Sequence, residues 1–178
     1  MKAMSISEAL RYANQKIRPM VNDALGGEVL DTVAEVEHAK IQSEVYDKHK
    51  PKHYKRRGDR GGLSDMEHNL AINNASLKLG ALYVENVTPP NPFNNGVGVR
   101  PIDGVGGYSS TTPDEPIAGL VERGTYNPNG YGYDYWSDAF ARPFIAKTRA
   151  ALRGGKAQKA LADGLRRNGL TVITKKGR

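Results

Sequence analysis

The residues whose side chains are best suited to catalysis or metal binding are four histidines and a few carboxylates. His49 and His53 have the i,i+4 spacing of two metal ligands on a helix, but Pro51 lies between them and disfavours a shared helical face. The chain has no cysteine, which excludes disulfides, thiolate metal sites and a cysteine nucleophile. No serine lies in a nucleophile-elbow motif. We therefore expect no metal, no cofactor and no hydrolase triad.

Acid–base catalysis would need paired carboxylates, and the sequence offers them only in or beside one polar loop. They are Glu115, Glu122, Asp134 and Asp138. Acidic side chains in loops are usually solvated, and nothing in their surroundings predicts a raised pKa. The sequence therefore favours a protein that is not an enzyme.

An aromatic loop, residues 125–141, has the composition of an adaptable contact surface. Gly and Asn are interspersed with aromatic side chains, and Tyr gives a large contact area at a small entropic cost. The predicted subunit or partner contacts are Tyr126, Tyr131, Tyr133, Tyr135 and Trp136. The alternative is a loop that folds back over its own sheet. Stacking on single-stranded nucleic acid is disfavoured by the nearby Asp134 and Asp138.

Basic charge is unevenly distributed along the chain, whose net charge is +7. Residues 1–47 hold five basic and eight acidic residues, whereas residues 140–178 hold eleven basic residues and one acidic residue. A basic cluster near residue 55 is predicted to contact a polyanion or an acidic surface. Its members are Lys52, Lys55, Arg56, Arg57 and Arg60. The alternative is a solvated loop after a helix end, where the helix dipole favours cations anyway.

The N-terminal region, residues 1–50, is predicted to be helical. The segment from Ser5 to Glu8 has capping-box spacing. Pro19 is expected to kink or break the helix that follows, and Gly26-Gly27 to interrupt it. Its apolar face comprises Leu10, Ala13, Ile17, Val21 and Ala24. A second helix is expected over residues 28–48. Its apolar stripe includes Val29, Val33, Val36, Ile41 and Val45, with Glu28, Asp31, Glu35, Glu37 and Glu44 on the solvent side.

The rest of the chain mixes extended and helical patterns. Residues 63–87 predict a β-hairpin with strands near 70–72 and 77–84. Residues 88–116 contain six Pro and five Gly and predict an extended loop or arm. A short apolar helical turn comes next, at Ile117, Leu120 and Val121. Pro143 then predicts the start of a helix, and Gly154-Gly155 predicts a less regular stretch within it. Gly169 predicts the end of the helix, and residues 170–174 predict a last strand.

Several short motifs, taken in order, resemble those of the tail-completion (neck, head–tail joining) proteins of long-tailed bacteriophages. In the first half they are Val45-Tyr46, the run from Pro51 to Arg57, and Gly61-Gly62-Leu63. In the second half they are the segments 120–125, 141–145 and 161–165. The resemblance covers most of the chain outside residues 88–115. It departs from that family at Arg123, where an aromatic residue is common.

The resemblance implies a structural virion protein without catalysis, in a single domain spanning residues 1–178. The implied fold is α+β, with a small antiparallel β-sheet, N-terminal helices and a C-terminal helix packed on it, and long loop insertions. Such proteins form homo-oligomeric rings, often hexamers, in the virion neck. Their partners are head connector or portal-adaptor proteins and tail terminator or tail tube proteins, and a contact with DNA in the channel is a further expectation.

Two classes of function therefore remain open from the sequence. The first is the neck protein just described, made in the host cytoplasm. The second is a basic nucleic-acid-binding accessory protein that uses residues 48–60 and the C-terminal tail. The N-terminus has no apolar run of signal-peptide length, and no stretch has the roughly 20 apolar residues that a membrane span requires, so we expect no membrane partner.

Overall fold

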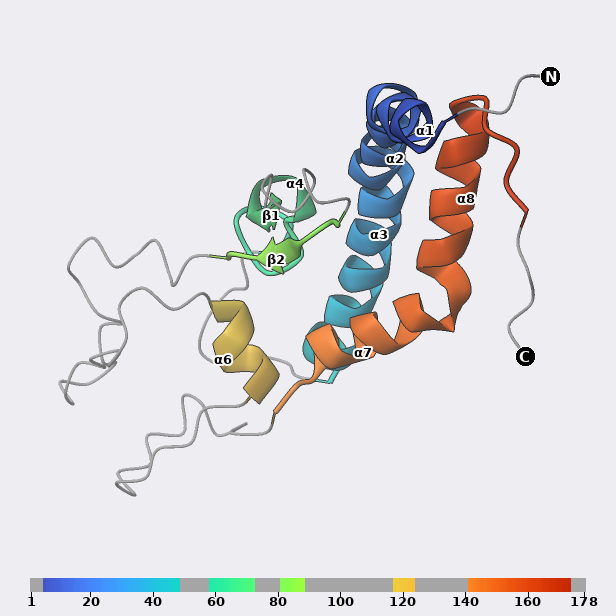
Figure 1. The fold of residues 1–178 in the computed structure, drawn as a ribbon. Helices are drawn as coiled ribbons and strands as arrows, with labels where there is room; N and C mark the ends of the chain where they lie inside the picture. The colour runs from blue at the N-terminus through green and yellow to red at the C-terminus, as the bar shows by residue number, and fades with distance from the viewer. Residues whose placement is uncertain (1–4, 49–57, 73–80, 89–116, 124–140, 174–178) are drawn as a thin grey trace, which may run out of the picture. The chain divides into compact units, whose positions relative to one another are not determined.

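The computed structural model describes residues 5–48, 58–72, 81–88, 117–123 and 141–173 (Figure 1). The chain divides into two compact units. The terminal unit comprises residues 1–37, 72–84 and 147–178, and the central unit comprises residues 38–71 and 85–146. The described part is mostly helical and has a small two-stranded antiparallel sheet, consistent with an α+β fold.

The N-terminal region is helical from Ile6 to Tyr46, as the sequence predicts. Its elements are α1 (Ile6–Tyr12), η1 (Ala13–Ile17), α2 (Arg18–Ala24), η2 (Leu25–Val29), α3 (Leu30–Ile41) and η3 (Gln42–Tyr46), where η marks a π-helical turn. The predicted capping box is present. The Ser5 hydroxyl accepts the Glu8 N–H at 3.3 Å, and the Glu8 carboxylate accepts the Ser5 N–H at 2.8 Å.

The interruption predicted at Gly26-Gly27 is wrong, and Pro19 does not break the helix, because helical backbone passes through both positions. Pro19 lies in the first turn of α2, directly after η1. A π turn widens the backbone and shifts its hydrogen-bond register, which accommodates a residue without an N–H. Glu37, expected on the solvent side of α3, is buried. It lies four residues from both Val33 and Ile41, at the edge of the apolar stripe.

In the terminal unit, α8 (Ala157–Arg167) packs along α2 and η2. The core of this unit contains Leu25, Val29 and Ala160, with Val21, Val33, Leu82 and Leu161 packed against it. The predicted apolar face of the first helix is only partly used. Ala24 is buried, but Leu10 is 60% exposed and Ile17 is 38% exposed.

The C-terminal helical region bends at a glycine, as predicted. Here α7 (Phe144–Ala151) continues into η5 (Leu152–Lys156), where Gly155 has φ 104°, and α8 leaves in a new direction (Figure 1). Gly169, with φ 83°, ends α8 in a Schellman motif. Its N–H donates to Arg166 O at 2.9 Å, and the Leu170 N–H donates to Leu165 O at 3.0 Å.

The strand predicted at residues 170–174 is not formed, since the described residues 170–173 have no ladder. β-Branched residues favour a strand only where another strand pairs with them. The predicted strand β1 (Leu70–Ile72) is present and pairs with β2 (Val84–Asn86). Of the second predicted strand, residues 77–80 lie outside the described residues, residues 81–83 are irregular, and β2 begins at Val84.

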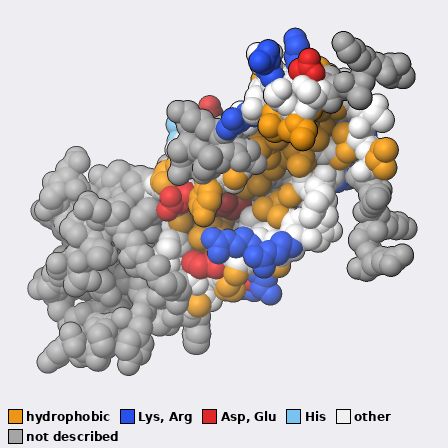
Figure 2. All heavy atoms as spheres, viewed as in Figure 1, with side chains coloured by type: hydrophobic (Ala, Val, Ile, Leu, Met, Phe, Trp, Pro, Cys, Tyr) orange, Lys and Arg blue, Asp and Glu red, His pale blue; other side chains and the backbone are white. Residues whose placement is uncertain are grey.

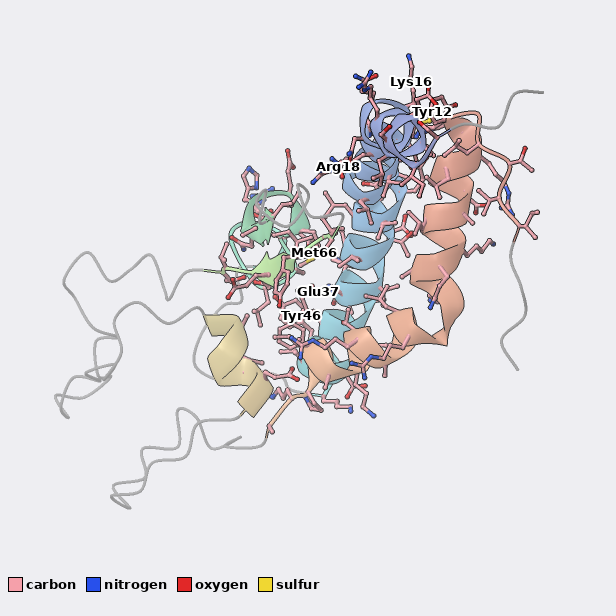
Figure 3. All side chains as sticks on the ribbon, viewed as in Figure 1. Tyr12, Lys16, Arg18, Glu37, Tyr46 and Met66 are labelled. Carbon is pink, nitrogen blue, oxygen red and sulfur yellow. The ribbon has the colours of Figure 1, made fainter. Side chains whose placement is uncertain are left out.

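The central unit has its own core. The short helices α4 (Met66–Asn69) and α6 (Ile117–Arg123) belong to it, and the apolar helical turn predicted near residue 120 is therefore present. The buried residues of the core are Ile41, Val45, Leu63, Ala118 and Phe144. Tyr46, Met66, Val121 and Ile145 pack around them, and Tyr46 and Met66 are labelled in Figure 3. Residues from four separate stretches of sequence thus share one core.

Candidate functional site

The most informative local geometry joins the end of α6 to the start of α7. Both carboxylate oxygens of Glu122 accept hydrogen bonds from the first turn of α7. The Ile145 N–H donates to Oε2 at 2.8 Å, and the Ala146 N–H donates to Oε1 at 2.9 Å. The Arg142 N–H also donates to Val121 O at 3.0 Å. We call this set of contacts the clamp.

The clamp supplies what the local sequence of α7 lacks. The residue before α7 is Pro143, whose side chain has no oxygen to accept the free amides of the first helical turn. Glu122 fills that role from 23 residues away. A negative charge there also interacts favourably with the positive end of the helix dipole. The expectation that Glu122 is a solvated loop carboxylate is therefore wrong.

The clamp rests directly on the core of the central unit. Phe144, the first residue of α7, is 0% exposed, and Ala118 of α6 is 2% exposed. Both belong to one buried cluster with Ile41 and Val45. Because interiors are close-packed, side chains in such a cluster have little freedom to shift. The clamp is thus fixed by packing as well as by hydrogen bonds.

The clamp lies at the two ends of the segment 124–140, which carries the predicted contact residues. Tyr126, Tyr131, Tyr133, Tyr135 and Trp136 lie outside the described residues, as do Glu115, Asp134 and Asp138. What the structure does show is the base of this segment. The chain enters it from α6 and returns at residue 141, and the clamp holds these two ends together.

A second anchored feature is a buried polar network, which fixes the turn at residues 58–65 to the sheet. Asp65 accepts the Gly61 N–H at 2.7 Å and the His68 N–H at 3.2 Å. The Asn69 side chain donates to Gly62 O at 2.6 Å, and the Asn86 side chain donates to Leu63 O at 3.2 Å. Among the buried polar residues of this region are Ser64, Asp65, Asn69, Asn86 and Thr88. Buried polar groups satisfied in this way fix a backbone conformation.

Two histidine–carboxylate pairs accompany this network. His68 Nδ1 lies 2.9 Å from Asp65 Oδ1, and His38 Nε2 lies 3.4 Å from Asp59 Oδ1. The hydrogen bond from His68, followed by that from the Gly61 N–H, lowers the pKa of Asp65. The hydrogen bond with Asp65 and the charge of Asp65 raise the pKa of His68. A hydrogen bond with Ser64, more than the contact with His38, lowers the pKa of Asp59.

The predicted basic cluster lies mostly outside the described residues. Lys52, Lys55, Arg56 and Arg57 belong to residues 49–57, which are not described. Arg60 is described and exposed, on the turn that the polar network holds. His49 and His53 also lie outside the described residues. Within the described ranges, no three His, Asp or Glu side chains are grouped as metal ligands, and no helix is long and apolar enough to cross a membrane.

Sequence reasoning missed the clamp and the polar network for the same reason. Each depends on partners that are distant in the sequence, such as Glu122 with Ile145 and Asn86 with Leu63. The signal that could have found the clamp was a proline at the helix start with no capping side chain beside it. Such a helix needs an acceptor from elsewhere in the fold.

Comparison with known proteins identifies the family. The family model described as YomN matches residues 9–167. The chain belongs to the YomN family. YomN is a phage-associated family, and the match spans the N-terminal helices, the central unit and α8. No curated protein and no solved structure matches the chain.

Proposed function

We propose that this member of the YomN family is a structural virion protein of a tailed phage. In this proposal it forms a homo-oligomeric ring in the neck, with a hexamer as the expected size, and joins the head connector to the tail. We propose no catalytic activity for this protein. Its partners are connector or portal-adaptor proteins on one side and tail terminator or tail tube proteins on the other.

The observation that carries the proposal is the clamp. Two motifs that resemble those of neck proteins, at residues 120–125 and 141–145, supply Glu122, Arg142 and Ile145 to it. A loop whose ends are fixed by packing and hydrogen bonds can vary in sequence without disturbing the fold. The Tyr-rich content of 124–140 suits a contact with another protein chain. The phage association of the family supports this setting.

The test uses the full chain with purified connector and tail proteins, followed by sedimentation velocity. The test variant replaces three tyrosines, Tyr131→Ser, Tyr133→Ser and Tyr135→Ser. The control variant replaces Tyr12 and Tyr83, which are 53% and 67% exposed in the terminal unit, by serine. We expect the test variant to remain folded and to lose association, while the control associates normally.

Two results would overturn the proposal. The first is the absence of any association between the unsubstituted protein and the connector or tail proteins. The second is unfolding of the triple-tyrosine variant as a monomer, measured by circular dichroism. That outcome would show that the segment 124–140 contributes to the core and is not a contact surface.

A further inference from the structure

Exposed basic side chains recur along the C-terminal helical region of the terminal unit. We call this set the basic helix surface; its members are Lys147, Arg149, Arg153, Lys156 and Lys159, and all five are exposed or half-exposed. The sequence has no Asp or Glu between Asp138 and Asp163. On the face shown in Figure 2, Lys and Arg side chains gather over α7.

The cations of this surface differ from those at the end of α8. Arg166 pairs with Asp163 at 2.8 Å, and Arg167 pairs with Asp23 at 3.3 Å and with Glu28 at 2.7 Å. Among the residues that the structure describes, no member of the basic helix surface has an ion pair. Its charge is therefore not neutralised by the described part of the chain.

The helix dipole accounts for only some of these cations, because Arg149 lies in the last turn of α7 and Arg153 in the last turn of η5, where a cation is favoured. Lys147 lies in the first turn of α7, and Lys156 and Lys159 flank the start of α8 after the bend at Gly155. A cation near a helix N-terminus interacts unfavourably with the helix dipole. The Glu122 carboxylate offsets that effect at the start of α7, whereas α8 has no acidic residue in its first turn. Lys159 is thus a cation that the dipole of its own helix does not favour.

The neighbours of the cations indicate the kind of partner. The other exposed residues from 146 to 159 include Ala146, Ala150, Gly154 and Gln158, and no large apolar side chain there is exposed. A helix that binds a membrane surface inserts large apolar residues, and a protein interface has an apolar or aromatic centre. A phosphate backbone needs only exposed cations and close approach.

We infer that the basic helix surface binds the phosphate backbone of duplex DNA, without reading its sequence. Duplex DNA is a polyanion with regularly spaced charges, and the family of this chain is phage-associated. The inference rests on the charges of α7, η5 and α8 and not on the proposed ring. It also assigns the DNA contact to residues other than the basic cluster at Lys52–Arg60.

The experiment measures binding of the full chain to a fluorescent duplex of about 25 base pairs by anisotropy, at several salt concentrations. The test variant carries Arg149→Gln, Arg153→Gln and Lys156→Gln. The matched control carries Arg11→Gln, Lys16→Gln and Arg18→Gln, which removes the same charges from exposed residues of α1, η1 and α2 in the same unit. Lys16 and Arg18 are labelled in Figure 3, away from α7.

We expect the test variant to bind at least about tenfold more weakly at about 0.1 M salt. The slope of log affinity against log salt should become shallower by up to about 2.7, which is about 0.9 for each phosphate that the variant no longer neutralises. The control should retain its affinity within about twofold. Circular dichroism spectra of all variants check that the fold is retained.

Three outcomes would overturn the inference. If the control loses as much affinity as the test variant, binding reflects net charge and not this surface. If a third variant, Lys55→Gln with Arg56→Gln and Arg57→Gln, alone loses binding, the DNA contact lies in the basic cluster. If polyglutamate or vesicles of anionic lipid bind as tightly as the duplex, the surface recognises acidic partners in general.

Discussion

Replacing Glu122 with alanine removes the acceptor for two amides at the start of α7. In the native protein the Ile145 and Ala146 N–H groups donate to this carboxylate at 2.8 and 2.9 Å. Pro143 offers no replacement, because its side chain has no polar atom. The hydrogen bond from Ile145 is part-buried, whereas that from Ala146 is exposed, so water can replace only the second one readily.

The expected loss of stability follows from these contacts. Loss of a helix cap costs about 1 kcal/mol, and loss of a negative charge at a helix N-terminus costs about 0.3–1 kcal/mol. We therefore expect Glu122→Ala to lower the free energy of unfolding of the central unit by about 1–2 kcal/mol. The variant Glu122→Gln retains one acceptor oxygen without the charge and should lose about half as much.

The assay is hydrogen exchange of the Ile145 and Ala146 amides, together with urea denaturation. A local loss of about 1–2 kcal/mol corresponds to exchange that is faster by a factor of about 5–30. The control is Glu85→Ala on β2, because Glu85 is an exposed carboxylate in the same unit. A surface substitution of this kind should change stability by less than about 0.5 kcal/mol.

One result would refute the reasoning about the clamp. If the hydrogen-exchange rates of the Ile145 and Ala146 amides are no higher in Glu122→Ala than in Glu85→Ala, the Glu122 carboxylate does not hold the start of α7. The ends of the segment 124–140 would then be fixed by the packing of Phe144 alone. The structural support for the proposed contact loop would be correspondingly weaker.

Two further predictions test other parts of the fold. In Gly164→Ala the new Cβ would lie 2.7 Å from Ala24 Cβ and 3.0 Å from Ala24 Cα, so we expect a loss of about 1–3 kcal/mol in urea denaturation. In the control Gly26→Ala the new Cβ meets no atom within 4 Å, so this variant should be as stable as the native protein or more stable by up to about 1 kcal/mol. Equal stability of the two variants would contradict close packing of α2 and α8. The Asp65–His68 pair should contribute most to stability between roughly pH 3.8 and 6.5. Because the pKa of Asp65 is lowered in the folded protein, the contribution of Asp65 is lost as the pH falls through that lowered pKa. Because the pKa of His68 is raised, the contribution of His68 is lost as the pH rises through that raised pKa. In Asp65→Asn the pKa of His68, followed by NMR titration, should fall toward 6.5, and an unchanged pKa would show that the pair does not interact.

Features that depend on neighbours within one helical turn could be predicted from the sequence. The capping box at Ser5, the helix start beside Pro143 and the helix end at Gly169 are of this kind. Each is set by a side chain or a backbone preference acting three to five residues away. The bend at Gly155 is similar, because glycine alone tolerates its positive φ at little cost.

Features that depend on register are harder to predict. Pro19 is expected from sequence to kink or break a helix; the helix is not broken, because the π turn before Pro19 accommodates the missing hydrogen bond. The burial of Glu37 is not evident from the sequence either, although this residue lies four positions from the buried Ile41 on the same helix. A strict 3.6-residue period cannot represent a helix that gains a residue in some turns.

The sequence by itself determined the local elements of this protein and its excess of basic charge near the C-terminus. Only the tertiary structure decided which distant residues meet. It turned Glu122, expected to be a solvated acid, into the cap of α7, and it placed Asn86 against Leu63. It also left residues 170–173 without a strand to pair with. The physical reason is that packing of the whole unit brings up a hydrogen-bond acceptor or a strand partner from about 20 or more residues away. Such a partner does not change the periodic pattern of the local sequence.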